Sequence, residues 1–155
     1  MAPPRRFFAM AALVSLAACR AAPVLVVTPA PATPEATVMA FLAAVDSNAA
    51  DRMAALWGTD HGPSTVVIRN ARERDRRISI MYLMLRHDAF QFVPAPGPTT
   101  VREGRRVLHV ELTRGDRRAT VPFTLVPLRA GGWLVEDIGL EAVMPIANPR
   151  RQSPP

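Results

Sequence analysis

The chain has 155 residues, 19 basic and 13 acidic, with a formal net charge of +6 and one cysteine. This length fits a single domain with its own hydrophobic core. All the basic residues are arginines, and their excess over the acids is mild, without a basic face interleaved with aromatic residues, which argues against a nucleic-acid-binding surface. The single cysteine excludes an intramolecular disulfide, so stability must come from packing.

The N-terminal segment has the pattern of a secretory signal peptide. Arg5 and Arg6 precede an apolar run too short to span a bilayer, and residues 16–19 read Leu-Ala-Ala-Cys. This ending resembles the lipobox of bacterial lipoproteins, a family in which the cysteine is acylated and becomes the first residue of the mature chain. The resemblance implies that residues 1–18 are removed and that Cys19 carries lipid such as palmitate.

The export route and the membrane stay open. Arg5 and Arg6 followed by Phe8 also fit a twin-arginine signal, but Pro4 stands where such signals usually carry Ser or Thr, which favours the general secretory route. Arg20 follows the cysteine, where an aspartate favours inner-membrane retention in some Gram-negative bacteria. We therefore expect a lipid-anchored protein of the bacterial cell envelope, on the periplasmic face of the outer membrane if the cell has one.

A proline-rich tether is predicted over residues 19–33, because frequent prolines disfavour helix and keep a chain extended. The apolar cluster at residues 24–27 docks as a strand or lies against the domain or the bilayer, and the pattern does not choose between these. The folded domain is expected over residues 34–143. Residues 144–155, with four prolines, are predicted to form a disordered tail.

Three helices are predicted at the start of the domain. The first begins at Thr33 and Pro34, which suit the N-cap and the first helical position, and runs to Asp46. The second covers about residues 49–57, before Gly58, and the third about residues 66–86. The side chains expected to be buried in them are Val38, Phe41, Leu42, Val45, Met53, Leu56, Trp57, Ile68, Ala71, Ile78, Met81, Tyr82 and Leu85.

Four strands follow, because the apolar residues then alternate with a period of two. They include residues 90–92, 108–112, 119–125 and a last strand that opens at Trp133 after two glycines. The Arg-Gly-Asp sequence at residues 114–116 predicts a hairpin turn between the second and third strands. Pro122 places the third strand at a sheet edge or at a bulge.

Helices followed by antiparallel strands predict an α+β fold, with three N-terminal helices packed on a curved four-stranded antiparallel sheet. The helix start at residues 33–36, the Trp57-Gly58 helix end and the closing strand at residues 131–138 resemble the cystatin-like, nuclear-transport-factor-2-like (SnoaL-like) superfamily over residues 34–143. The resemblance implies a conical pocket between sheet and helices, used in that superfamily for isomerases, dehydratases, ligand binding or nothing at all. Fold alone does not decide among them.

Tyr82 and Asp137 are the candidate pocket residues. An isomerase-like site needs a carboxylate base and a tyrosine or protonated acid that stabilises an oxyanion. Asp137 alternates in phase with Trp133 and Val135, so it points inward if no bulge intervenes, while Glu136 then points outward. Ordinary packing accounts for Tyr82 on the buried stripe of its helix. We therefore favour structural roles for both residues and keep catalysis as the alternative.

Other catalytic patterns find no support in the sequence. His61, His87 and His109 lie in separate predicted elements without the spacing of a metal site. The serines lack a nucleophile-elbow context, and the glycines of the domain lie in turns instead of a phosphate-binding loop. We expect no metal, no cofactor and no catalytic residue.

Arginines gather from Arg69 to Arg77, where Glu73 and Asp75 are interleaved with them. A solvated helix face with weak ion pairs is the favoured interpretation. The alternative is contact with anionic lipid headgroups, an anionic envelope polymer or an envelope protein. The sequence thus predicts an anchored, non-catalytic binding domain with an unknown partner; the alternative is a ligand carrier or an isomerase- or dehydratase-like enzyme.

Overall fold

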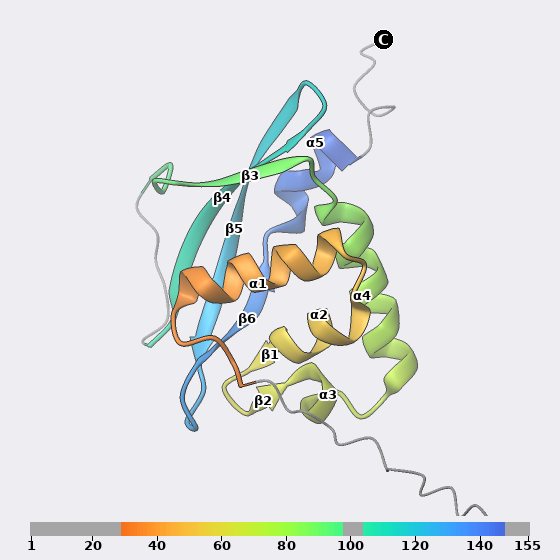
Figure 1. The fold of residues 1–155 in the computed structure, drawn as a ribbon, viewed down its shortest axis with the longest axis vertical. Coiled ribbons are helices and arrows are strands. Elements are labelled where there is room, and N and C mark those ends of the chain that lie inside the picture. The colour runs from red at the N-terminus through yellow and green to blue at the C-terminus, as the bar shows by residue number, and fades with distance from the viewer. Residues whose placement is uncertain (1–28, 98–103, 148–155) are drawn as a thin grey trace, which may run out of the picture.

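The computed structural model describes residues 29–97 and 104–147 (Figure 1). These residues form a mixed α+β fold with a four-stranded antiparallel meander and a separate two-stranded sheet, which confirms the predicted class and the four-stranded sheet. The elements are α1 (Pro34–Asp46), α2 (Ala50–Leu56), β1 (Gly58–Thr59), β2 (Gly62–Pro63), α3 (Ser64–Val67), α4 (Ala71–Leu85), β3 (Ala89–Val93), β4 (Arg106–Arg114), β5 (Arg117–Pro127), β6 (Trp133–Ile138), the 3₁₀ helix η1 (Leu140–Val143) and α5 (Met144–Ala147).

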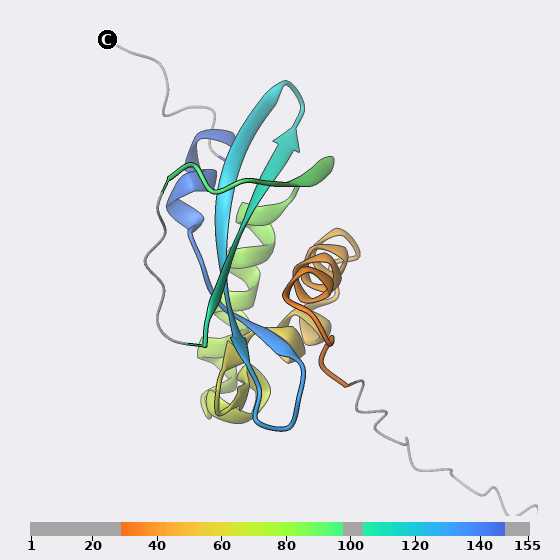
Figure 2. The same ribbon diagram turned by 90° about the vertical axis from the view of Figure 1, so that its left-hand side faces the viewer.

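Helix α1 begins where the sequence predicts. The Thr33 side chain accepts a hydrogen bond from the Ala36 backbone N–H at 3.1 Å, and Pro34 occupies the first helical position. The helix crosses one face of the sheet (Figures 1 and 2). Its buried Phe41 meets Phe123 of β5 edge-on, with ring centroids 6.5 Å apart. The apolar stripe of α1 therefore supplies the contact between helix and sheet.

The predicted helix over residues 66–86 is wrong in its first part, because two helices occupy this stretch. Asn70 is extended at the N-cap of α4, and its side chain accepts from the Glu73 N–H at 3.3 Å. Asparagine favours such a cap over a helix interior because its side chain competes for backbone hydrogen bonds. Ile68 is consequently only half-buried and Ala71 exposed, whereas Ile78, Met81 and Leu85 are buried as predicted.

A buried serine secures the end of α2. The Ser64 hydroxyl donates to the Ala54 carbonyl at 2.7 Å, and the Ser64 N–H donates to the Trp57 carbonyl at 2.6 Å. Gly58 ends the helix as predicted, and a Cβ there would lie 2.2 Å from the carbonyl oxygen of Gly62. The β1-β2 hairpin therefore closes only around glycine.

The predicted hairpin at residues 114–116 is confirmed, since it joins β4 to β5 with Gly115 at φ 60°. The same turn positions Arg114 against the end of α4. Its Nε donates to the Arg86 carbonyl at 2.7 Å, and its Nη2 lies 3.4 Å from the carbonyls of Leu83 and Met84. Burial lowers the pKa of Arg114, with a contribution from repulsion by Arg86. A strand residue thus satisfies carbonyl groups that the end of a helix leaves free.

Pro122 lies in an inner strand but at a local edge. It pairs with His109 of β4, whereas the ladder to β6 ends one residue away, at the Phe123 and Ile138 pair. The Gly139 N–H donates to the Pro122 carbonyl at 2.9 Å. Because the N and O of a strand residue point to the same side, the proline nitrogen faces the place where β6 has ended. The predicted edge position of this strand is therefore wrong, since β5 lies between β4 and β6, and the bulge lies at Thr124 and Leu125 instead of at Pro122.

The ordered domain is longer than predicted at both ends. Residues 144–147, assigned to the tail by sequence, form α5, because Ile146 and the preceding Val143 are buried against the core. At the other end, the Trp133 N–H donates to the Pro31 carbonyl at 2.9 Å, so the last residues of the predicted tether dock beside β6. The remaining tether, including residues 24–27, and the tail from residue 148 lie outside the described residues.

The hydrophobic core lies between the sheet and the helices, and the fold has two distinct ends. The β5-β6 turn and α3 lie at one end, where Pro29 lines a hollow with residues of both, while the β4-β5 hairpin and α5 lie at the other end (Figures 1 and 2). The largest fully buried side chains belong to Phe41, Phe123, Leu42, Met53, Leu56, Leu85, Leu112, Leu125, Leu134, Val38, Val45 and Val110.

Candidate functional site

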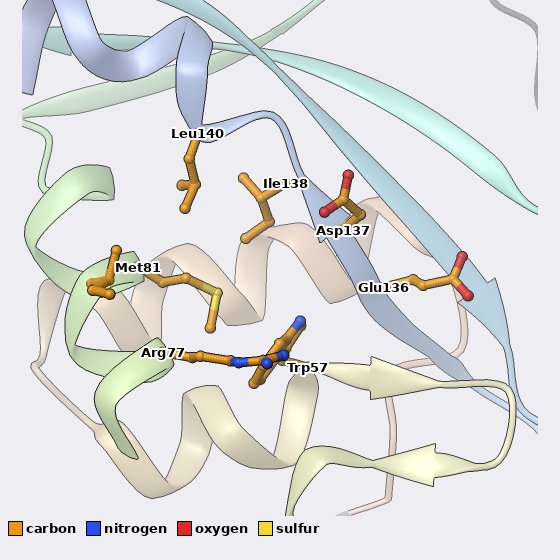
Figure 3. A pocket seen from close by; sticks show the side chains of 8 residues that line it. Trp57, Arg77, Met81, Glu136, Asp137, Ile138 and Leu140 are labelled. Carbon is orange, nitrogen blue, oxygen red and sulfur yellow. The ribbon is translucent and has the colours of Figure 1, made fainter. Parts of the chain in front are cut away.

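A hollow of about 300 Å³ opens between α4 and β6 (Figure 3). Its apolar surface comes from α4, the start of the β1-β2 hairpin, β6 and η1, and its charged groups stand on α4 and β6. The lining residues are Trp57, Arg77, Ile80, Met81, Glu136, Asp137, Ile138 and Leu140. The indole of Trp57 is positioned by a parallel bridge between its backbone and Val135, which attaches the end of α2 to the sheet.

A β-bulge turns Asp137 outward, so the inward orientation expected without a bulge does not occur. Leu125 pairs with Val135, yet the adjacent Thr124 pairs with Asp137, which leaves Glu136 as the extra residue. An extra residue reverses the alternation of side chains along a strand. Ile138 therefore takes the buried position and Asp137 is exposed at the rim of the hollow.

Glu136 is the better buried of the two carboxylates. Arg105 Nη2 donates to Glu136 Oε1 at 2.6 Å, and Arg105 Nε pairs with Oε2, so the contact is bidentate. The hydrogen bonds that Arg105 donates to Glu136 raise the pKa of Arg105. Desolvation acts in the opposite direction, and charge attraction by Glu136 and Asp60 adds a smaller increase. This carboxylate is therefore already paired within the protein.

Arg77 is also paired. Its Nε donates to Glu73 Oε1 at 2.7 Å, one turn earlier on α4. Asp137, by contrast, has no side-chain hydrogen bond or ion pair among the described residues. The hollow thus presents an aromatic and aliphatic surface next to one free carboxylate. Such a site suits a ligand that has an apolar body and a positively charged group.

Tyr82 does not join Asp137 at this hollow. It is half-buried on α4, where it packs against the hydrophobic core, and it is not among the residues that line the hollow. The hollow therefore does not bring Tyr82 and Asp137 together as the oxyanion donor and the base that the enzyme alternative requires. Sequence reasoning missed Arg105 and Arg77 as the groups that neutralise neighbouring carboxylates, because those pairs depend on the three-dimensional arrangement.

The remaining sequence-based candidates are dispersed. Within residues 29–97 and 104–147, no group of three His, Cys, Asp or Glu residues could hold a metal ion. The same part of the chain contains no helix long and apolar enough to cross a membrane. Cys19, the predicted lipidation site, lies outside the described residues.

The arginine run is divided by the helix start. Arg74 pairs with Asp75 at 3.0 Å, in addition to the Glu73 and Arg77 pair described above. Arg69, Arg72 and Arg76 are exposed and have no ion pair within the described part of the chain. Within the described residues, this arginine-rich stretch therefore has three arginines without an ion pair, whereas Glu73 and Asp75 each pair with an arginine.

A larger hollow of about 570 Å³ lies beside the docked N-terminal segment. Its lining is mainly apolar, and it includes Pro29 and Ala30 together with Asp51 and Arg52 of α2. We consider the α4-β6 hollow the better candidate site, because it combines an aromatic side chain with a carboxylate that has no partner among the described residues.

Comparison of the chain with protein-family models, with curated proteins and with solved structures finds no match.

Proposed function

We propose that the protein is a lipid-anchored protein of the bacterial cell envelope, held through Cys19, whose domain has a non-catalytic binding role. The observation that carries the binding role is the hollow between α4 and β6, where apolar side chains border Asp137, a carboxylate without a partner in the part of the chain that the structure describes. The anchor rests on the Leu-Ala-Ala-Cys sequence at residues 16–19. The ligand is proposed to be a small molecule or a side chain with an apolar body and a cationic group.

For the domain itself we propose the cystatin-like, nuclear-transport-factor-2-like arrangement. The helices precede the sheet, the four strands form an antiparallel meander with a bulge, and a hollow lies between helix and sheet. The closing strand after Gly131 and Gly132 supports the same assignment. An experimental structure in which α1 does not cross the sheet would contradict it.

The anchor is tested by metabolic labelling with a palmitate analogue. The unchanged chain should incorporate label and sediment with membranes, whereas Cys19→Ser should lose the label, remain uncleaved by the lipoprotein signal peptidase and lose the lipid-dependent attachment. Labelling that persists in Cys19→Ser would refute acylation at this residue.

The hollow is tested by nuclear magnetic resonance titration of isotope-labelled protein with phenethylamine and with 3-phenylpropionate. The amine should shift the signals of Trp57, Ile80 and Ile138, and the anion should not. Asp137→Asn should remove this preference, while Asp116→Asn, at the exposed β4-β5 turn, should retain it. Equal responses to both probes, or shifts confined to residues elsewhere, would contradict the proposed site.

A further inference from the structure

The side of α4 that faces away from the core carries a distinct set of side chains. Arg72, Arg76, Ile80 and Leu83 follow one another at intervals of three or four residues, so they share one stripe of the helix. We call this stripe the outer face of α4. Ile80 and Leu83 are 44% and 59% exposed, so this stripe presents two large apolar side chains to solvent on the same helix as the arginines.

The outer face of α4 carries two positive charges, Arg72 and Arg76, that have no ion pair among the described residues. Both acids of α4 are at the margins of this stripe, where Glu73 binds Arg77 at 2.7 Å and Asp75 binds Arg74 at 3.0 Å. Arg72 and Arg76 therefore keep their full charge for an external partner. The two arginines lie on the first half of α4, and the exposed apolar side chains follow on the second half. Leu83 lies about 16 Å along the helix axis from Arg72, at 1.5 Å per residue.

We propose that the outer face of α4 docks on the surface of an anionic lipid bilayer, with the two arginines at headgroup phosphates and Ile80 and Leu83 inserted between headgroups. A helix with exposed arginines and aliphatic side chains matches the charge and polarity of that interface. This docking surface shares Ile80 with the rim of the α4-β6 hollow, whereas Arg72, Arg76 and Leu83 do not line the hollow.

The position of the chain entry favours the bilayer over other acidic partners. Pro29 lines a hollow together with Thr65 and Val66 of α3, and α3 and the N-terminal end of α4 lie at the same end of the molecule (Figures 1 and 2). Pro29 follows Cys19 by ten residues, which span at most about 36 Å when fully extended. This step rests on the proposed anchor at Cys19, which would hold the arginines continuously near headgroups.

The test uses the chain from residue 19 onward with Cys19→Ser, which contains every described residue and no acyl group. Binding is measured by sedimentation with vesicles of phosphatidylcholine alone and of phosphatidylcholine mixed with phosphatidylglycerol. We expect binding to the anionic vesicles that weakens as salt is raised. At about 1 kcal/mol for each arginine at the surface, Arg72→Gln with Arg76→Gln should weaken this binding roughly thirtyfold.

The matched control is Arg106→Gln with Arg118→Gln, which removes the same charge from exposed arginines of β4 and β5. This control pair should change binding by less than about threefold, since salt largely screens charges that are far from the docked face. Leu83→Gln should weaken binding while leaving its salt dependence in place. Circular dichroism of every variant establishes that the fold is retained.

Two results would overturn the proposal. Equal losses in the α4 and control pairs would show attraction by net charge alone, and absence of binding to anionic vesicles would exclude the bilayer. If soluble polyglutamate bound instead, and the α4 pair abolished that binding, the outer face would take an acidic polymer. Because the assay contains no lipid on the protein, its failure is independent of labelling at Cys19.

Discussion

Replacement of Ser64 by alanine should destabilise the domain more than its small size suggests. The hydroxyl is fully buried and donates to the Ala54 carbonyl at 2.7 Å, in the last turn of α2. Without it this buried acceptor loses its donor, which costs about 1–3 kcal/mol of unfolding free energy. Ser47 offers a matched control, since its hydroxyl donates to the Ala43 carbonyl at 2.8 Å but is exposed, so water replaces it. Ser47→Ala should cost less than about 0.5 kcal/mol.

Urea unfolding followed by tryptophan fluorescence measures this difference. With an m value of about 2 kcal/mol/M, a loss of about 2 kcal/mol lowers the midpoint by about 1 M for Ser64→Ala. The Ser47→Ala midpoint should stay within about 0.25 M of the unchanged protein at the same m value. Equal midpoints for the two variants would refute the reasoning, because burial would then have no effect on the value of the hydrogen bond.

Three further outcomes are expected. Gly58→Ala should lower the free energy of unfolding by about 1–3 kcal/mol, and with it the thermal midpoint, because the new Cβ would lie 2.2 Å from the Gly62 carbonyl oxygen. Gly97→Ala is the control. A Cβ at Gly97 meets none of the described atoms within 4 Å, so this variant should leave the thermal midpoint unchanged. Phe123→Ala removes a fully buried ring and should cost about 3–5 kcal/mol in chemical denaturation, and a cost under 1 kcal/mol would contradict the described core. Arg114→Gln should accelerate amide hydrogen exchange in the last turn of α4, and unchanged exchange there would rule out its capping role.

Local sequence was sufficient for elements whose cause is local. Thr33 and Pro34 start α1 through groups within one turn of each other, and the hairpin at residues 114–116 follows from Gly115 between two alternating runs. Alternation also predicted the buried face of the sheet, including Val110 and Phe123. These features depend on contacts between near neighbours, or on a period that is visible in the chain.

The candidate site was only partly predictable. Asp137 was identified as a residue of interest, but its orientation depends on the bulge that places Thr124 opposite it. Glu136 pairs with Arg105, 31 residues away. Of the two carboxylates that line the hollow, Asp137 is therefore the one without a partner among the described residues. Neither register nor ion pairing between distant residues has a local pattern from which it can be derived.

The sequence by itself determined the class of fold, the four-stranded antiparallel sheet that follows the N-terminal helices, and most of the buried residues, and it predicts lipidation at Cys19. Tertiary structure decided where helices end and which charges remain free. Arg114 caps α4 from a strand, Ser64 satisfies α2 from the next helix, and α5 is ordered because Ile146 reaches the core. The physical reason is that helix periodicity and turn chemistry act within a few residues, whereas burial and pairing act between segments that only folding brings together.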